Sequence, residues 1–333
     1  MEKFLIAIDA GTTNTRAALL DQEGKLIGLQ KAAVGVRNTA IDGDNHKLRE
    51  AVKGCIKALL TNRGLLMADL GGIVASGMIT SNVGLVEVPH ICAPADAKTL
   101  AENVRAITLP EVCDCPIWFI PGIKSAQGPI GLDNFEDMDI MRGEEVESVA
   151  VIAQLHRGEP MLLVLPGSHT KFVAVDRARQ ITGSLTTIAG ELLSAITQDT
   201  ILADAVGRQF VAPGDYDPEL MAAGYKEAEK YGLGRAAFLG RILNQFAIKD
   251  KIKIANYILG TVIQGDVQAA EQWLKGRGTG HTVVCGTGTM SRALADALAM
   301  DGGFGEVAMF DGDGELPLST MGALEILRQG NYI

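Results

Sequence analysis

The feature that most constrains the fold of this chain is a layout that occurs twice, in which two apolar runs flank a short turn of small and polar residues. In the first copy the apolar run 5–8 ends in Asp9, and the turn 10–14 separates it from a second apolar run. The second copy spans residues 162–176. Short apolar runs around such a turn predict a β-hairpin, and a repeated unit predicts two related domains.

The similarity between the two copies continues beyond the hairpins. Asp21 and Asp176 are each followed, at the same spacing, by an aliphatic residue and then by a glycine. Further along, residues 73–77 resemble residues 283–286, and both segments end in small residues. We therefore expect each domain to open with a three-stranded meander, the first of which ends at residues 26–34, and to contain a later buried strand.

The turns of the repeat have the composition of a phosphate-binding loop. Gly11 lets the backbone approach a ligand closely, and successive N–H groups in such a turn form an anion-binding nest. Thr12 and Thr13 add hydroxyl donors, and two such turns could clamp one polyphosphate. Asp9 cannot bind phosphate itself, but it could hold a hydrated Mg²⁺ that does. The Walker motif G-x4-G-K-[ST] is absent, and an ordinary hairpin with Asp9 as a capping residue is the alternative interpretation.

Five motifs then follow one another in a fixed order. They are D-x-G-T-T-N-x-R at 9–16, S-G-M-I at 76–79 with E-x-P at 87–89, M-R-G-E-E at 141–145, L-P-G-S-H-x-K at 165–171 and G-E-L at 190–192. In these motifs the chain resembles the 2-dehydro-3-deoxygalactonokinase family of the sugar kinase/Hsp70/actin superfamily. It departs from the family pattern at Thr80, Asn82, Leu85 and Ala189, and these differences bear on the exact substrate more than on the reaction type.

The resemblance implies an α/β fold of two ribonuclease H-like domains with a nucleotide cleft between them. It places an N-terminal domain with the sugar-binding loops at 1–120. A C-terminal domain at 121–333 would carry a helical insertion near 205–278 and the adenine site. The implied enzyme is a cytoplasmic, ATP- and Mg²⁺-dependent phosphotransferase with an alcohol group as acceptor. Its implied reaction is phosphorylation of 2-dehydro-3-deoxy-D-galactonate at the 6-hydroxyl, in galactonate or galactose catabolism.

Three charged residues are predicted to carry the catalytic chemistry. Phosphoryl transfer to a hydroxyl needs a proton acceptor, and a carboxylate serves in kinases. In related sugar kinases an acid that often follows a glycine lies some twenty-odd residues before the second phosphate loop. Glu144 directly follows a glycine and lies 24 positions before Ser168. We prefer Glu144 as the general base, and Glu145 and Asp139 remain candidates. The alternative interpretation is that the two glutamates only stabilise a helix N-terminus. Arg142 could bind a substrate carboxylate bidentately, and Asp9 is the predicted metal residue.

The remaining site predictions concern the nucleotide and the sugar acid. A glycine-rich turn between the strand 281–285 and the helix 290–300 is typical of a nucleotide site, and the loop 76–87 is dense in hydroxyl groups. The predicted nucleotide contacts are Gly11, Thr12, Thr13, Asn14, Gly167, Ser168, His169, Thr170, Gly286, Thr287 and Gly288. The predicted substrate contacts are Arg16, Ser76, Met78, Thr80, Ser81, Glu87, Lys124 and Glu145. The alternative interpretations are that residues 76–87 form a simple surface loop, that His169 is structural and that Lys124 is a solvated lysine.

Composition excludes several classes of partner. The formal net charge of −10 argues against nucleic acid but not against a small anion. The five cysteines lack zinc-ligand spacing and are odd in number, which indicates a reducing cytoplasm. No apolar run approaches the ~20 residues of a membrane span. Sugar acid and ATP are thus the expected partners, and a homodimer stays open. The rival functions are another sugar or sugar-acid kinase and a non-catalytic nucleotide-binding switch.

Periodicity predicts the remaining elements. The predicted helices are 45–63 with Gly64 as its C-cap, 96–106, one that Asp139–Met141 would cap, 189–206, 219–231, 233–248, 250–264, 267–275 and a final helix within 314–327. The predicted strands beyond the meanders are 73–75, 118–121 and 281–285, the last being the final core strand.

Overall fold

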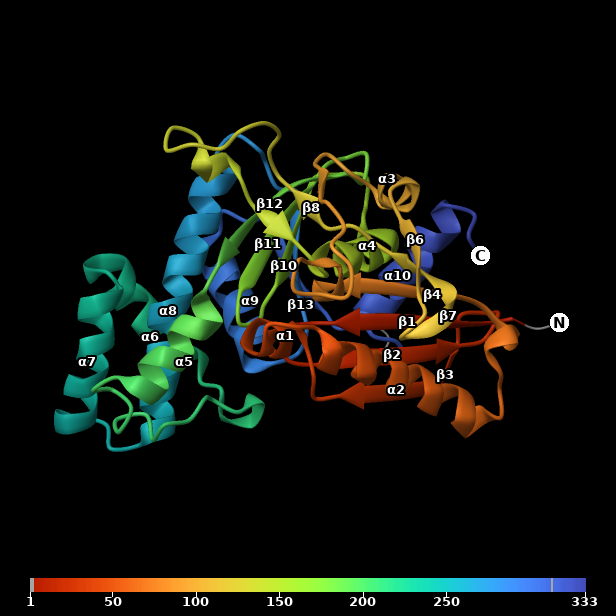
Figure 1. The fold of residues 1–333 in the computed structure, drawn as a ribbon. Helices are drawn as coiled ribbons and strands as arrows, with labels where there is room; N and C mark the ends of the chain where they lie inside the picture. The colour runs from red at the N-terminus through yellow and green to blue at the C-terminus, as the bar shows by residue number, and fades with distance from the viewer. Residues whose placement is uncertain (1–2, 313) are drawn as a thin grey trace. The chain divides into compact units, whose positions relative to one another are not determined.

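The computed structural model describes residues 3–312 and 314–333 and divides into two compact units (Figure 1). The first unit comprises Met1–Arg157, Ala178–Gly183 and Gly312–Ile333, and the second comprises Gly158–Arg177 and Ser184–Asp311. The predicted division has a single boundary after residue 120. The observed first unit also contains helix α4 (Glu144–Leu155) and the C-terminal helix α10 (Leu318–Gln329), because these two helices pack against each other.

The first unit contains a six-stranded sheet in the order β3-β2-β1-β4-β7-β6. Its strands are β1 (Phe4–Ala10), β2 (Thr15–Leu20), β3 (Leu26–Ala32), β4 (Leu70–Gly77), β6 (Arg105–Leu109) and β7 (Cys113–Phe119). The central strand β1 pairs antiparallel with β2 and parallel with β4. The predicted hairpin, the meander and the buried fourth strand are therefore confirmed. β1 and β4 are nearly continuous apolar runs because helices cover both faces of the sheet.

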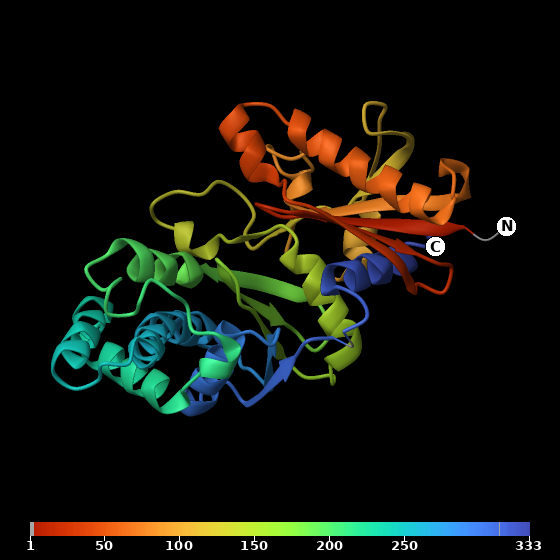
Figure 2. The same cartoon turned by 90° about the horizontal axis from the view of Figure 1, so that it is seen from below.

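Helices lie on both faces of this sheet. In Figure 2, α2 (His46–Arg63) lies above the strands and α10 lies below them. α2 packs on β2 and β3 through Leu48, Val52 and Leu59, and it ends at Gly64 in the left-handed conformation, as predicted. The smaller elements are α1 (Val36–Asp42), α3 (Ala97–Glu102), β5 (Ile91–Cys92), β8 (Ile123–Lys124), β9 (Ile140–Met141) and short 3-10 helices at Met67–Asp69, Met78–Thr80 and Phe135–Asp137.

The second unit contains a five-stranded sheet in the order β12-β11-β10-β13-β14. Its strands are β10 (Met161–Leu165), β11 (Thr170–Val175), β12 (Ile181–Thr187), β13 (His281–Cys285) and β14 (Glu306–Phe310). β10 pairs antiparallel with β11 and parallel with β13, which is the pairing of β1 with β2 and β4 in the first unit. The predicted duplication is thus confirmed, and the two units are ribonuclease H-like domains. The edge strand β14, whose side chains are mostly exposed, was not predicted.

Helices make up most of the rest of the second unit. They are α5 (Ala189–Asp199), α6 (Pro218–Tyr231), α7 (Leu233–Phe246), α8 (Lys251–Leu274) and α9 (Thr289–Asp301), with a 3-10 helix at Pro213–Asp215. The predicted break at Gly265 is wrong, because α8 runs through it without interruption. A helical glycine costs about 1 kcal/mol, and burial of Ile258, Ile263 and Val267 on either side outweighs that cost.

Several further boundaries differ from the sequence analysis. The predicted strand 118–121 is the end of β7, which begins at Cys113 and ends at Phe119, and the final helix predicted within 314–327 begins at Leu318 and ends at Gln329. The predicted helix 96–106 ends at Glu102, because β6 begins at Arg105. The predicted helix 189–206 ends at Asp199 and continues as turns. Asp139–Met141 were predicted to cap the next helix, but residues 140–141 form β9. The N-cap of α4 is Gly143, which has a φ of 115°. Each unit has its own hydrophobic core, and no helix among residues 3–312 and 314–333 has the length and apolarity to cross a bilayer.

Candidate functional site

Asp9 lies in the first unit at the end of the central strand, with Arg16 opposite on β2 and Ser76 opposite on β4. Burial raises the pKa of this carboxyl, Arg16 opposes the shift, Glu144 adds to it, and a hydrogen bond from Ser319 opposes it. The first residue of α4 therefore brings a second carboxylate close to Asp9. Gly77 makes room for this approach, because a Cβ there would lie 2.9 Å from Oδ1 of Asp9.

The two adjacent glutamates of α4 have different surroundings. Glu144 is half-buried, and its Oε2 accepts the backbone N–H of Arg142 at 3.1 Å. Glu145 is only 1% exposed, its Oε2 accepts the N–H of Gly143 at 2.8 Å, and its Oε1 has no hydrogen-bond partner. Burial, and next Glu144, raise the pKa of Glu145 to about 8. Glu145 is therefore protonated at neutral pH and poorly placed to accept a proton.

Arg142 holds the loop after β4 in place. Its guanidinium donates to Oγ1 of Thr80 at 2.7 Å and to the carbonyl of Val88 at 2.8 Å, and it lies 3.3 Å from Nδ1 of His90. Burial, with the positive charges of Arg142 and Lys124, lowers the pKa of His90 to about 4. A neutral His90 accepts from Arg142 through Nδ1 and carries its proton on Nε2, which is buried and has no partner. The loop therefore presents one unpaired donor.

The predicted sugar contacts in this loop are not equally accessible. Ser76, Thr80 and Ser81 are buried, and the hydroxyls of Thr80 and Ser81 donate to the carbonyls of Gly77 and Met78. These hydroxyls hold the turn together. Glu145, which was also predicted to contact the substrate, is buried as well. The remaining predicted contacts keep some exposure: Arg16 and Glu87 are exposed, whereas Met78 and Lys124 are half-buried.

The first predicted phosphate turn is closed by a hydrogen bond from the N–H of Gly11 to the carbonyl of Asn14 at 2.9 Å. The side chains of Thr12, Thr13 and Asn14 are exposed, and the amide of Asn14 donates to the Thr13 hydroxyl. Gly35 passes so close that a Cβ would lie 2.5 Å from the carbonyl of Thr12. The turn is thus backed by main chain and open on its other side.

The second predicted phosphate turn lies in the second unit against the N-terminus of α5. The N–H of Glu191 donates to the carbonyl of Ser168 at 3.1 Å, and Oε1 of Glu191 lies 3.1 Å from Nε2 of His169. Gly167, Ser168 and His169 are exposed, whereas Thr170 is fully buried. The exposed part of the turn is therefore residues 167–169, and the Thr170 side chain points into the core.

The third predicted turn borders an apolar cavity of about 310 Å³ in the second unit. Gly288 and the start of α9 form one wall, α5 and α8 form others, and residues 209–211 and 213 complete it. The hydroxyls of Thr197 and Thr289 donate to the carbonyls of Leu193 and Val211, each at 2.8 Å. Gly286 and Thr287 come directly before Gly288 in the chain and do not line the cavity, and the Thr287 hydroxyl donates to Oδ2 of Asp311 at 3.4 Å.

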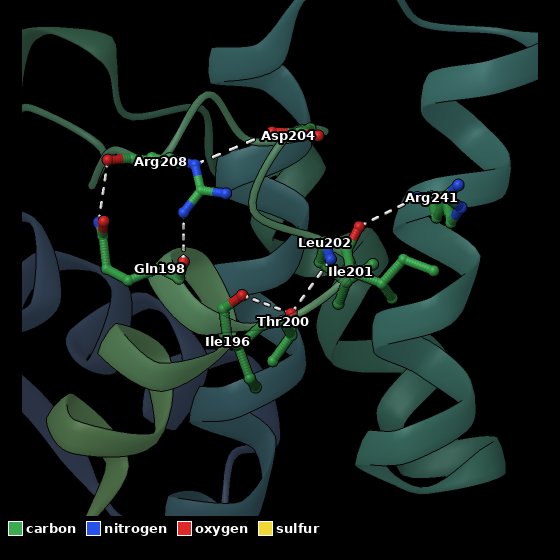
Figure 3. A network of polar contacts seen from close by, with 8 residues as sticks. All are labelled: Ile196, Gln198, Thr200, Ile201, Leu202, Asp204, Arg208 and Arg241. Carbon is green, nitrogen blue, oxygen red and sulfur yellow. Dashed lines mark hydrogen bonds and ion pairs between the residues drawn. The ribbon is translucent and has the colours of Figure 1, made fainter.

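A network of polar contacts fixes the chain just before residues 209–211 (Figure 3). Arg208 adopts a φ of 54°, donates to the carbonyl of Gln198 at 2.7 Å and lies 3.9 Å from Asp204. The Gln198 amide donates back to the carbonyl of Arg208 at 2.9 Å. On the other side of the turn, Arg241 of α7 donates to the carbonyl of Ile201 at 3.0 Å. The cavity wall that begins at residue 209 is therefore anchored to α5, and the turn before it is anchored to α7.

The structure adds four residues that the sequence analysis did not single out. Ser319 and Glu147 lie with Asp9, His90 lies with Arg142, and Asp266 lies under the second turn. Glu147 could have been found from the sequence, because it lies three positions after Glu144 and residues at i and i+3 of a helix share a face. No group of three His, Cys, Asp or Glu side chains within the described residues is arranged as a metal site.

Comparisons with known proteins give a consistent family. A family model described as 2-keto-3-deoxy-galactonokinase matches residues 9–313. A 2-dehydro-3-deoxygalactonokinase of Escherichia coli is 26% identical over 257 residues, which cover 77% of this chain and 72% of that one.

Two solved structures share the fold. One, from Sinorhizobium meliloti and provisionally named a 2-dehydro-3-deoxygalactonokinase, superposes with a TM-score of 0.77 at 23% identity, over 97% of this chain and 98% of its own. Component A of the (R)-2-hydroxyglutaryl-CoA dehydratase of Acidaminococcus fermentans gives a TM-score of 0.50 at 11% identity, over 97% of this chain and 96% of its own.

Proposed function

The chain belongs to the 2-keto-3-deoxy-galactonokinase family, and from this premise we propose that it transfers the γ-phosphate of ATP to the 6-hydroxyl of 2-dehydro-3-deoxy-D-galactonate. It is a phosphotransferase with an alcohol group as acceptor. The donor, the position of transfer and a cytoplasmic role in galactonate catabolism are the finer parts of the proposal. The observation that supports it most strongly is the proximity of Asp9 and Glu144 at one end of the first sheet.

Asp9 fits a hydrated Mg²⁺. Its carboxyl is buried beside a second carboxylate, and burial raises its pKa, so the ionised form is incompletely compensated by Arg16. A divalent cation at this position would supply the missing positive charge. No three His, Cys, Asp or Glu side chains of the described residues are arranged to hold a metal ion, so the remaining ligands of a cation at Asp9 would be water and phosphate oxygens. When bound, the metal supplies positive charge to the nucleotide phosphates.

We assign the nucleotide phosphates to the exposed turn 167–169 and the adenine to the apolar cavity of about 310 Å³, both in the second unit. The exposed turn 11–14 of the first unit is a further candidate for binding phosphate. An apolar cavity with few polar groups suits the face of a purine. Exposed backbone and hydroxyl donors in the turns suit an anion whose charge increases in the transition state. Gly286, Thr287 and Gly288 would lie between the base and the phosphates.

Glu144 is the proposed general base. It is half-buried and accepts one backbone N–H, so its second oxygen is free to accept the proton of a hydroxyl. Glu145, in contrast, is protonated near pH 7 and turned into the core. We infer that Glu145 supports the start of α4 and that Glu144 removes the proton of the attacking hydroxyl.

The sugar acid is proposed to bind beside the loop after β4. Arg142 and Lys124 supply positive charge there, as their joint effect on the pKa of His90 indicates. Three of the five N–H donors of Arg142 are already engaged by Thr80, Val88 and His90, so its remaining N–H groups would meet the carboxylate from a fixed position. The exposed Glu87 could accept from a sugar hydroxyl.

A panel of acceptors tests the proposal. With ATP and Mg²⁺, we expect ADP release with 2-dehydro-3-deoxy-D-galactonate and much less with galactose, which lacks the carboxylate. The C4 epimer, 2-dehydro-3-deoxy-D-gluconate, is the matched control for hydroxyl recognition. If only an aldose is phosphorylated, the proposed substrate is wrong and the protein is another sugar kinase. ATP binding without phosphorylation of any acceptor would favour a nucleotide-binding switch.

A further inference from the structure

Asp266 of α8 is a buried carboxylate that the proposed mechanism does not use. It is 3% exposed, and its side chain reaches the hydroxyls of Thr170 and Thr187. Oδ2 of Asp266 and both hydroxyls are buried, yet none makes a hydrogen bond of good geometry. Burial raises the pKa of Asp266 to about 6, the hydroxyls of Thr187 and Thr170 oppose the shift, and no charged group among the described residues contributes to it.

The two threonines belong to the segments that form the second phosphate turn. Thr170 is the first residue of β11, directly after the exposed residues 167–169. Thr187 ends β12, two residues before α5. The start of α5 contacts the turn closely, since a Cβ on Gly190 would lie 2.2 Å from the carbonyl of Gly167. Asp266 therefore lies where it can hold the turn and the start of α5 together.

α8 also connects this carboxylate to the proposed adenine cavity. Ala255 and Leu259 of α8 line that cavity, whereas Gln264 and Asp266 line a second cavity of about 200 Å³ together with Thr187. Leu259 and Asp266 are two helical turns apart, or about 10 Å along the axis. One rigid helix thus carries both a wall of the proposed base site and the support of the phosphate turn.

We propose that Asp266 is a positioning residue whose ionised carboxylate accepts hydrogen bonds from Thr170 and Thr187 and so fixes the phosphate turn 167–170 against the N-terminus of α5. The proposal rests on the proposed function only in that this turn binds nucleotide phosphates. Orphaned polar atoms this deeply buried are costly, and ordering of the turn by bound nucleotide would bring them into hydrogen-bond geometry.

Protonation changes what this carboxyl can offer. An ionised carboxylate accepts from both hydroxyls, whereas a protonated acid or an amide presents a donor on one side, so one contact must reverse. The turn should therefore be positioned correctly only above the pKa of Asp266. The acidic limb of the pH profile then carries a contribution from Asp266, and Asp266→Asn removes that contribution.

The test compares the pH dependence of kcat/KM for ATP in the wild type, Asp266→Asn and Asp296→Asn. Asp296 is the matched control, because it accepts from the hydroxyl of Tyr216 on the same unit and has no contact with the turn. We expect Asp266→Asn to be about tenfold less active than the wild type at pH 8 and to lack the fall centred near pH 6, whereas Asp296→Asn keeps the wild-type profile. A wild-type profile in Asp266→Asn would overturn the proposal.

A second measurement distinguishes a failure of this proposal from a failure of the proposed function. It also tests the proposal if Asp266→Asn does not fold. Thr187→Val removes one hydroxyl at nearly constant volume and leaves the carboxylate in place. With the non-hydrolysable analogue AMP-PNP bound, amide hydrogen exchange over residues 167–170 should be faster in Thr187→Val than in the wild type. Equal exchange would refute the positioning role, and neither result depends on whether the protein phosphorylates a sugar acid.

Discussion

Replacement of Glu145 by glutamine removes a carboxyl group that is protonated in the folded protein and ionised in the unfolded chain at neutral pH. The pKa of Glu145 in the folded protein is about 8, against 4.5 for an ordinary glutamate. The unfolded chain therefore releases the proton at a lower pH than the folded chain does. The stability that Glu145 contributes is fully present below pH 4.5 and is lost as the pH rises towards 8, at about 1.4 kcal/mol per pH unit between these values.

Glu145→Gln should consequently stabilise the protein at neutral and alkaline pH. The amide oxygen can still accept the N–H of Gly143, and no charge has to be suppressed. The expected gain is about 3 kcal/mol at pH 7 and close to zero at pH 4.5. Urea unfolding of both proteins at a series of pH values measures the difference directly. Because Glu147 titrates in both proteins, its own raised pKa cancels in the comparison.

The same variant should retain most of the kinase activity, since Glu145 is not the proposed base. Glu144→Gln is the matched control, as it changes the neighbouring residue, which is half-buried and not buried in the core. A stability difference that does not change between pH 5 and 7.5 would refute the assignment of a neutral Glu145. Loss of turnover in Glu145→Gln with full turnover in Glu144→Gln would exchange the roles of the two glutamates.

Three further predictions concern the proposed catalytic groups. Asp9→Asn should lower kcat at least ~100-fold without loss of thermal stability, because the ionised carboxyl is costly to bury; near-normal turnover would remove Asp9 from the mechanism. Glu144→Gln should lower kcat by about 10²–10⁴ and leave the calorimetric affinity for ATP unchanged, whereas a changed affinity with full kcat would argue against a base. Arg142→Ala should raise KM for the sugar acid more than for a neutral sugar, and equal effects on both would show that Arg142 only holds Thr80 and Val88.

The repeat was the most informative part of the sequence. Two apolar hairpins with equivalent turns predicted both meanders, and residues 73–77 and 283–286 predicted the parallel strands beside them, because those strands are buried and their apolar pattern is strong. The edge strand β14 was missed because an exposed edge needs little apolar pattern. The uninterrupted α8 was missed because its burial is a tertiary effect that a local glycine conceals.

The site was predictable only where a motif gave its chemistry locally. Asp9 and the glutamates of M-R-G-E-E could be named from type and spacing, but sequence alone could not distinguish Glu144 from Glu145, since burial differs between them. His90 and Asp266 come near the other candidates only through contacts between distant segments. The predicted donor Thr170 points inward for the same reason, since Asp266 lies 96 positions further along the chain.

The most direct test of the account is a proton-coupled ³¹P NMR spectrum of the reaction of ATP and Mg²⁺ with 2-dehydro-3-deoxy-D-galactonate. We expect a new phosphomonoester resonance, coupled to the two protons of C6, in the presence of the wild-type protein. This resonance should grow far more slowly with Glu144→Gln. A product phosphorylated at another carbon, or ATP that is converted only to ADP and inorganic phosphate, would contradict the account.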